Sequence, residues 1–328
     1  MSVPHPAGSE KESDVDVIGD VLRTVRLRGT VYFQAEFRAP WGMDINGGEV
    51  ANFHLVVEGR CWVSPTDGGD GFWLERGDLV VFPHGDAHRL AHDPAATPVP
   101  AERVLRELRS CGAECPAYGG TGPPTRLVCG HFERAAASRH RLLDTLPPVI
   151  LLRREECARD DWLHAAAQLA AAEASEQGAG ASVVVDRLAE ALFVQVLRAH
   201  LSRETARTAG FGAALGDAGL VRVLQAMHED PLRDWSLAEL ARRGAMSRST
   251  LASRFRHAVG TTPMRYLTEW RLERARDALA HSGCTLAQAA RLAGYANEFS
   301  FARAFKRVYG ATPGSLRRAE AGGRFRAG

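Results

Sequence analysis

The sequence lacks any apolar run near the length of about 20 residues that a helix needs to cross a bilayer. Its first residues, MSVPHPAGSEKESDVD, are polar and acidic, without the basic and apolar segments of a secretory signal. These two absences argue against a membrane or secreted protein, and we expect a cytoplasmic one.

Lysine and cysteine are also scarce. Lys11 and Lys306 are the only lysines among 41 Lys+Arg residues, so arginine carries almost all of the positive charge. An arginine count by itself therefore says little about function. In a cytosolic chain the six cysteines are expected to be reduced thiols, which excludes a fold held together by disulfides.

Charge is divided unevenly along the 328 residues. The formal net charge is +2, but residues 218–328 hold 19 Lys+Arg against 9 Asp+Glu. The remaining residues hold 22 basic and 30 acidic side chains. A chain of this length has room for two domains. The asymmetry indicates a polyanion as the partner of the C-terminal one.

One stretch of sequence occurs twice. GTTPMRYL begins at Gly260 and GATPGSLR begins at Gly310, and SLAELARRGAMSRSTLASRFRHAVGTTP aligns with TLAQAARLAGYANEFSFARAFKRVYGATP. Each copy has apolar residues at helical spacing on both sides of a glycine, which predicts a helix, a tight turn and a second helix. Helix N-caps are expected at Ser236, Ser247, Thr285 and Asn297, with capping boxes completed by Glu239 and Gln288 and turns at Gly244 and Gly294.

The segment between the copies, PMRYLTEWRLERARDALAHSG, has the pattern of one long helix. The RL..A...L pattern of that helix, the Gly-Tyr pair before the last helix and F.RAFKR.YG.TP at 301–313 are motifs of a known family. Through them residues 218–318 resemble the DNA-binding domain of AraC/XylS-type transcription regulators. The resemblance implies two helix-turn-helix units whose second helices enter successive major grooves, about 34 Å apart.

The polar faces of these second helices supply the candidate DNA contacts. Arg303 is expected to pair with guanine, and Phe299 to touch a thymine methyl group. The remaining basic residues are expected to hold phosphates, which position a protein without reading sequence. Ser253 departs from the family, whose members often carry arginine there, so we expect less base readout from the first unit. The candidates are Arg248, Ser249, Ser253, Arg254, Arg256, Asn297, Glu298, Phe299, Ser300, Arg303, Lys306 and Arg307. A protein-interaction module with a basic face is the alternative.

Between residues 31 and 90 the pattern changes to short β-type runs such as VYFQAEF, FHLVVEG and LVVFP, separated by Gly, Pro and Asp. Short strands at this spacing predict a sandwich or barrel. The pattern G-x5-P-x-G-x2-H at 77–88 resembles the second conserved motif of cupins, and G-x5-H at 48–54 resembles the start of the first. The N-terminal half is thus similar to the cupin-type sensor domain of a subset of AraC-type regulators, the subset related to the reactive-chlorine-responsive regulator.

This resemblance also implies a place for a metal ion. Metal-binding cupins usually supply His-x-His, a glutamate and a later histidine, but Val56 stands at the second place here and no glutamate follows at the usual spacing. His54, His88 and His92 remain as candidate ligand-binding or metal-binding residues, with His84 nearby. The incomplete set argues against catalysis. Ordinary hydrogen bonds within the domain are the alternative role for these histidines.

Three cysteines lie close together in sequence: Cys111, Cys115 and Cys129. Cys129-Gly130 matches a cysteine site of the related sensor that reactive chlorine activates. That sensor pairs its cysteine with one near the N-terminus, which this sequence lacks, so Cys111 or Cys115 would supply the second thiol. A zinc site that adds His131 to the three cysteines is a second hypothesis. Inert thiols are the third.

Two helical patterns follow, DDWLHAAAQLAAAEASEQ and SVVVDRLAEALFVQVLRAHL. The second has a broad apolar face, and the equivalent helix of related regulators dimerises; packing on its own barrel is the alternative. SRETARTAGFGAALGD has the composition of a flexible linker. The predicted organisation is a tail at 1–15, a cupin-like sensor barrel at 16–157, a helical dimerisation element at 158–201, a linker at 202–217, a double helix-turn-helix domain at 218–320 and a tail at 321–328.

The expected fold class is α+β and multidomain: an N-terminal cupin-like β-barrel (jelly roll) plus helices, and a C-terminal all-α double helix-turn-helix domain. We expect a sequence-specific transcription regulator, not an enzyme, whose sensor domain responds to a small molecule or an oxidant. Its expected partners are double-stranded promoter DNA, RNA polymerase and a second copy of the chain, with no membrane partner and no required cofactor. The alternatives are a metal-dependent cupin isomerase or dioxygenase with an appended DNA-binding domain, and a metal- or ligand-buffering protein with incidental affinity for DNA.

Overall fold

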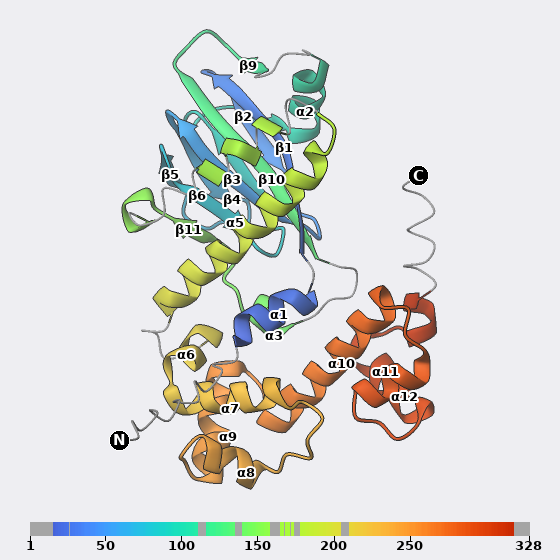
Figure 1. Cartoon of the computed structure of the whole chain (residues 1–328). Helices are drawn as coiled ribbons and strands as arrows, with labels where there is room; N and C mark the ends of the chain where they lie inside the picture. The colour runs from blue at the N-terminus through green and yellow to red at the C-terminus, as the bar shows by residue number, and fades with distance from the viewer. Residues whose placement is uncertain are drawn as a thin grey trace, which may run out of the picture. The chain divides into compact units, whose positions relative to one another are not determined.

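The computed structural model describes residues 16–25, 27–110, 116–134, 140–157, 165–166, 168–170, 172–173, 178–204 and 210–317. Its contacts divide into two compact units. The sheet unit comprises Val25–Arg207, and the helical unit joins the chain up to Thr24 to the chain from Thr208 onwards (Figure 1). Within the described residues, no helix combines the length and the apolar character that crossing a membrane requires.

Short strands build the sheet unit. One sheet has the strand order β11-β6-β3-β10-β1-β9, and the other has the order β5-β4-β7-β2-β8. Side chains from both sheets pack into one core between them. The unit is a two-sheet sandwich, which confirms the predicted cupin-type β-domain, although the strands do not close into one barrel. The strands are β1 Leu27–Arg38, β2 Gly42–Ile45, β3 Ala51–Glu58, β4 Arg60–Pro65, β5 Phe72–Glu75, β6 Leu79–Phe82, β7 His88–Ala91, β8 Val99–Pro100, β9 Ala117–Gly119, β10 Pro124–Arg134 and β11 Ile150–Leu152.

Helices accompany these strands within the sheet unit. They are α2 Ala101–Ser110, α3 Arg141–Asp144, the 3-10 turn η1 Arg154–Cys157 and α5 Ala181–Glu204. The amphipathic helix α2 buries Val104 and Leu108, and both side chains belong to the core between the sheets. This helix therefore closes part of the open edge of the sandwich.

Helix α5 covers the outer face of the six-stranded sheet (Figure 1). Phe193 of α5 meets Phe132 of β10 with ring centroids 4.8 Å apart, and Phe132 stacks on Phe53 of β3. Because this sheet is covered on both faces, all residues of β6 are buried and the usual alternation is lost. The middle of α5 thus packs on its own sheet, which was the alternative to dimerisation. At its start Val183 and Val184 remain 60% and 38% exposed.

The helical unit contains the two predicted helix-turn-helix copies, α8–α9 and α11–α12, joined by the long helix α10 (Figure 1). The N-caps are confirmed at Ser236, Ser247, Thr285 and Asn297, and both capping boxes form. Gly260 and Gly310 end α9 and α12 in the left-handed conformation, with φ of 75° and 72°. The helices are α6 Phe211–Gly216, α7 Ala218–Glu229, α8 Leu237–Arg243, α9 Arg248–Val259, α10 Pro263–His281, α11 Leu286–Leu292 and α12 Glu298–Tyr309.

Residues 202–217 were predicted to be a flexible linker, but the second half of this segment is helical. It forms helix α6, in which Phe211 is buried, and the ring of Phe211 lies near Tyr266 of α10 with centroids 6.4 Å apart. The side chain of Asp217 then caps α7 by accepting hydrogen bonds from two backbone N–H groups. Alanine and glycine dominate this segment and indicated flexibility. The buried face of α6, formed by Phe211, Gly212 and Ala214, packs this helix against the helical unit instead.

Helix α1, Val17–Val25, contacts the helical unit up to Thr24, whereas the sequence placed residues 16–157 in the sensor. Oδ2 of Asp20 lies 3.5 Å from Nδ1 of His228 on α7. Nε2 of His228 lies 2.8 Å from the hydroxyl group of Tyr266. Burial lowers the pKa of His228, and the hydrogen bond with His228 lowers the pKa of Asp20. At neutral pH the contact therefore joins an ionised carboxylate to an uncharged ring.

The turn between α8 and α9 contains an alanine in a glycine conformation. Ala245 has φ of 55°, the one positive value outside glycine among the described residues, and the matching residue of the second copy is Gly294 with φ of 77°. The glycine of the first turn is Gly244, the residue before Ala245. A side chain does not fit at Gly244, because its β-carbon would lie 3.0 Å from Met246 Cε and 3.0 Å from Val223 Cγ2. The first turn therefore carries backbone strain that the second avoids.

Replacing Ala245 by glycine is expected to raise the free energy of unfolding of the helical unit by about 0.5–1 kcal/mol, because relief of the left-handed strain outweighs the entropic cost of glycine. The measurement is the urea midpoint at unchanged slope. Gly294→Ala, the reciprocal change, should lower stability. A loss of stability in Ala245→Gly would show that the turn is not strained.

Candidate nucleic-acid interface and buried polar cluster

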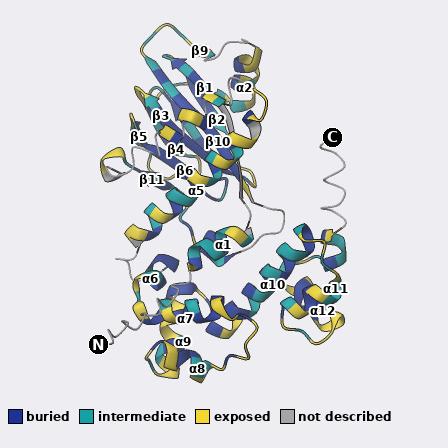
Figure 2. Cartoon of the chain, in the orientation of Figure 1, coloured by how far each residue is buried: buried dark blue, intermediate teal, exposed yellow. Residues whose placement is uncertain are grey.

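Helix α9 has one buried and one exposed face (Figure 2). Leu251, Phe255, Ala258 and Val259 face the core. The predicted DNA-binding residues Arg248, Ser249, Ser253, Arg254 and Arg256 are all exposed. The amphipathic pattern of the sequence therefore predicted which face of α9 is exposed.

Helix α12 shows the same division. Phe301, Ala304 and Phe305 are buried, whereas Asn297, Glu298, Phe299, Ser300, Arg303, Lys306 and Arg307 are exposed. Phe299 is 72% exposed, although burying a phenylalanine ring is favourable. The guanidinium carbon of Arg303 lies 5.9 Å from the centre of this ring. An apolar ring and a cation thus stand together on the outer surface of α12.

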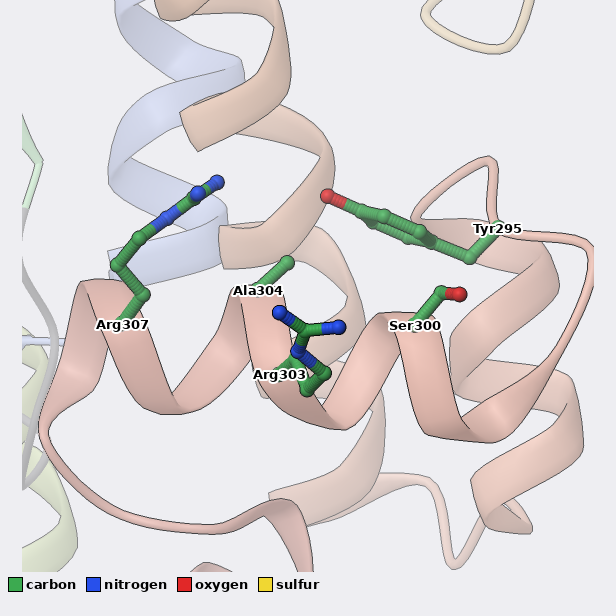
Figure 3. Close-up of a pocket in the computed structure, with 5 residues that line it drawn as sticks. All are labelled: Tyr295, Ser300, Arg303, Ala304 and Arg307. Carbon is green, nitrogen blue, oxygen red and sulfur yellow. The ribbon is translucent and has the colours of Figure 1, made fainter.

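A hollow of about 280 Å³ lies beside α12, lined by Tyr295, Ser300, Arg303, Ala304 and Arg307. Figure 3 shows Arg303 between Ser300 and Arg307, with Tyr295 across the hollow. No acidic side chain among the described residues forms an ion pair with Arg303 or Arg307. Two guanidinium groups without a carboxylate partner make this hollow suited to an anionic ligand such as a phosphate.

The two copies differ in how far their polar groups are already engaged. Nη1 of Arg254 on α9 lies 3.2 Å from Oδ2 of Asp217, and Oγ of Ser249 lies 2.9 Å from Oγ of Ser247. On α12, Oδ1 of Asn297 accepts the Ser300 N–H as the N-cap. That oxygen already accepts a hydrogen bond, so the amide nitrogen of Asn297 is the atom available to donate a hydrogen bond to DNA.

The sandwich core holds a buried polar cluster of His54, His88 and Cys129, which are 4%, 0% and 2% exposed. Cys129 on β10 is paired with His54 on β3, and its Sγ lies 3.0 Å from Nδ1 of His54. Nε2 of His54 lies 2.8 Å from Nε2 of His88. Nδ1 of His88 lies 2.7 Å from the carbonyl oxygen of Asp86. These contacts form one hydrogen-bonded chain.

The Asp86 carbonyl fixes every proton in that chain. A carbonyl only accepts, so Nδ1 of His88 must donate, and Nε2 of the neutral ring is then an acceptor. His54 donates from Nε2, which leaves its Nδ1 to accept the thiol proton of Cys129. Burial lowers the pKa of His88 to about 4 and lowers the pKa of His54 well below its usual range.

Burial also raises the pKa of Cys129, and the nearby Cys61 raises it further. The resting state is therefore a protonated thiol beside neutral rings. A thiolate is the reactive form of cysteine, so Cys129 is protected in this conformation. His54 accepts the hydrogen bond of this thiol and so fixes its orientation.

Other residues expected at this site lie elsewhere. The structure does not bring His92 to the cluster: its Nδ1 lies 3.0 Å and 2.8 Å from the backbone nitrogen and oxygen of Trp41. His84 donates to the Leu146 carbonyl at 2.8 Å. Nε2 of His131 lies 2.8 Å from Oε1 of Glu133. Cys111 and Cys115 lie outside the described residues, and the described ones include no group of three or more His, Cys, Asp or Glu arranged to hold a metal ion.

The contact between Cys129 and the two histidines, His54 and His88, was not predicted from the sequence. Cys129 and His54 are 75 residues apart, and only the pairing of β3 with β10 brings them together. Asp86 was missed because it acts through its backbone. The alternation of each strand was the available signal, since it places both side chains on the inner face of the sheet.

Comparisons with known proteins identify a family for each half of the chain. The Cupin family profile matches residues 16–202, and a Helix-turn-helix domain profile matches residues 240–319. The chain is 30% identical over 304 residues to a Streptomyces lividans protein described as an AraC-like transcription regulator, covering 93% of this chain and 98% of that one. A protein of the same description from Streptomyces antibioticus is 30% identical over 306 residues, covering 93% and 99%. The RCS-specific HTH-type transcriptional activator RclR of Escherichia coli is 26% identical over 307 residues, covering 92% and 97%.

Proposed function

The chain belongs to the AraC-type transcription regulators that carry an N-terminal cupin domain, and we propose that it binds a bipartite promoter sequence as a homodimer under the control of an oxidant. The observation that carries the DNA-binding part is the matched pair of helices α9 and α12, each with its basic face exposed. The relatives are named as transcription regulators, so the alternative of a cupin enzyme has no support. A protein that works on promoters is proposed to act in the cytoplasm.

Base readout is assigned mainly to α12. Arg303 is free to offer paired N–H donors to guanine, and the exposed ring of Phe299 offers an apolar contact for a thymine methyl group. Lys306 and Arg307 follow on the same helix and are proposed to hold phosphates. On α9 the contacts are proposed for Arg248, Ser249, Ser253, Arg254 and Arg256, with Arg254 already held by Asp217.

Dimer formation is proposed for the start of α5. Val183 and Val184 are exposed there, while the middle of the same helix is buried against the sheet. A dimer would present two copies of the DNA-binding unit, and RNA polymerase is the proposed partner of the DNA-bound form.

No cofactor is proposed to be required. A metal ion bound by the buried His54 and His88 is a second candidate for the ligand of the sensor domain. Elemental analysis of the purified protein would show whether a metal ion is bound.

The proposed signal is an oxidant acting on Cys129. The E. coli relative is named as specific for RCS, and the buried cluster gives this chain a thiol beside a proton acceptor. Hypochlorous acid converts a thiol to a sulfenic acid and hydrogen chloride, R–SH + HOCl → R–SOH + HCl, with sulfur oxidised and chlorine reduced. The thiol proton leaves with the chloride as hydrogen chloride, and the hydrogen bond to Nδ1 of His54 orients the thiol before it reacts. A sulfenic acid is larger than the thiol and would disturb the closely packed core between the sheets.

Selection of bound fragments from sheared genomic DNA near physiological salt tests the proposal. The full-length protein is used reduced and after mild hypochlorite, beside Cys129→Ser and the control Cys284→Ser, which changes a half-buried thiol of the helical unit. We expect one bipartite sequence, with occupancy that changes about fivefold or more on oxidation in the wild type and in the control but not in Cys129→Ser.

The outcomes separate the two parts of the proposal. An unchanged response in Cys129→Ser would remove the oxidant site and leave DNA readout in place. Failure to enrich any sequence, in either redox state, would remove DNA readout itself.

A further inference from the structure

Helix α10 is attached to the first helix-turn-helix unit by Arg271. Nη2 of Arg271 donates to the carbonyl of Arg233 at 2.8 Å, and Nε donates to the carbonyl of Pro231. Both acceptors lie in the loop between α7 and α8. That loop is held internally, because Nε1 of Trp235 donates to the Asp230 carbonyl at 2.9 Å and Arg233 lies over the Trp235 ring at 4.3 Å. Arg271 therefore joins α10 to a well-defined piece of backbone.

The same side chain lies beside the second unit. A β-carbon on Gly294, in the turn between α11 and α12, would stand 3.5 Å from Nη1 of Arg271. The next residue, Tyr295, lines the hollow beside α12 together with Arg303. One guanidinium group thus donates to the loop that precedes α8 and lies near the turn that precedes the second DNA-binding helix.

A second polar group attaches α10 to α12. Nη2 of Arg276 lies 2.9 Å from Oε1 of Glu273, and the two side chains are 0% and 1% exposed. The hydroxyl group of Tyr309, the last residue of α12, donates to Oε2 of Glu273 at 2.7 Å. Burial and the charge of Glu273 raise the pKa of Tyr309, so its hydroxyl group remains a donor.

These contacts differ in kind from the apolar core around them. Leu272, Phe301 and Phe305 pack together, but hydrophobic contact is non-directional and tolerates small rotations between helices. Charge-assisted hydrogen bonds are short and directional. A buried ion pair adds little net stability over an apolar pair, so its presence here calls for a geometric role.

We propose that Arg271 and the Glu273–Arg276–Tyr309 group are positioning residues that fix the distance and rotation between α9 and α12, and thereby the single spacing of DNA subsites that the protein accepts. The inference rests on the proposed DNA-binding function. Inserting one base pair between subsites moves the second by about 3.4 Å and rotates it by about 34°. A rigid pair of helices cannot follow that shift, whereas a loosened pair can.

The test uses full-length protein and the bipartite sequence recovered by selection, as the original duplex and with one base pair inserted between its subsites. The readout is the ratio of the two dissociation constants, because a general loss of stability lowers both affinities and leaves the ratio unchanged. For the wild type we expect a ratio of about tenfold or more, the penalty of misplacing at least one base contact.

Arg271→Ala removes both donors and is expected to lower the ratio to about threefold or less, with partial recovery in Arg271→Lys. Tyr309→Phe removes one hydrogen bond, keeps the ring, and should lower the ratio as well. Arg265→Ala is the matched control and should keep the wild-type ratio. Arg265 lies exposed on the same helix, and within the part of the chain that the structure describes its ion pair is with Glu269, four residues later on that helix.

Equal ratios in the wild type, Arg271→Ala and Tyr309→Phe would overturn the inference while the recovered sequence still supported the proposed function. A wild-type selection that enriches no bipartite sequence would overturn both. A circular dichroism spectrum and thermal midpoint for each variant confirm that folded proteins are compared.

Discussion

Replacing Glu273 by alanine is expected to lower the free energy of unfolding of the helical unit by about 3–5 kcal/mol, because it breaks a buried ion pair by removing one of its two partners. Arg276 is 0% exposed and donates to Glu273 from both Nε and Nη2, at 3.2 Å and 2.9 Å. The Tyr309 hydroxyl group loses its acceptor in the same variant, which adds to the cost. The measurement is a urea unfolding curve followed by helical circular dichroism.

The control is Arg265→Ala, which breaks the exposed pair with Glu269 on the same helix. Surface pairs of this kind contribute about 0–1 kcal/mol, so the two variants should differ by several-fold in their effect. If both lowered stability by a similar small amount, the Arg276 charge would have to be reaching solvent, and the buried pair would carry no special role.

Replacing Arg303 by alanine is expected to weaken binding to the selected DNA by about 1–3 kcal/mol, the usual value of a bidentate pair with guanine. Binding to random DNA should change much less, because phosphate contacts dominate there. Arg303 is exposed on α12 without an acidic partner among the described residues, and its guanidinium lies near the Phe299 ring. The measurement is a pair of dissociation constants, on selected and on random duplexes, at one fixed salt concentration.

Lys306→Ala provides the comparison for Arg303. As a phosphate contact, Lys306 should contribute equally to selected and random DNA, and its loss should reduce the slope of log K against log salt by about one. Should Arg303→Ala weaken both duplexes equally, the side chain would be a phosphate contact as well, and base readout would have to be reassigned along α12.

Patterns of neighbouring residues in the sequence predicted the helix ends and the buried helix faces of the DNA-binding domain. Both capping boxes, the N-caps of α9 and α12 and the buried faces of these helices follow from residues three or four apart, because one helical turn brings such residues together. The motif glycines likewise marked the ends of α9 and α12. The exposed faces of α9 and α12 could therefore be predicted from the sequence, while their contacts with DNA stay a prediction.

Contacts between distant segments could not be predicted. Nothing local to Cys129 indicates that its thiol meets His54, and nothing near Arg271 indicates that its guanidinium caps a loop 38–40 residues earlier. The helix at Phe211–Gly216, inside the predicted linker, was missed for the same reason, since Phe211 packs near Tyr266, a residue of a distant helix. His92 was grouped with His88 on the resemblance to the cupin motif, but the chain from His88 to His92 extends along β7 and past its end, which separates the two side chains.

The docking of α1 on the helical unit has a consequence for biosynthesis. Asp20 leaves the ribosome about two hundred residues before His228, so at the usual 5–20 residues per second it waits roughly 10–40 s for its partner. The sheet unit is completed during that interval, with one end of the chain still unattached. The helical unit can close only when the last third of the protein has been made, and a nascent chain stalled before that point would expose α1 to solvent and to chaperones.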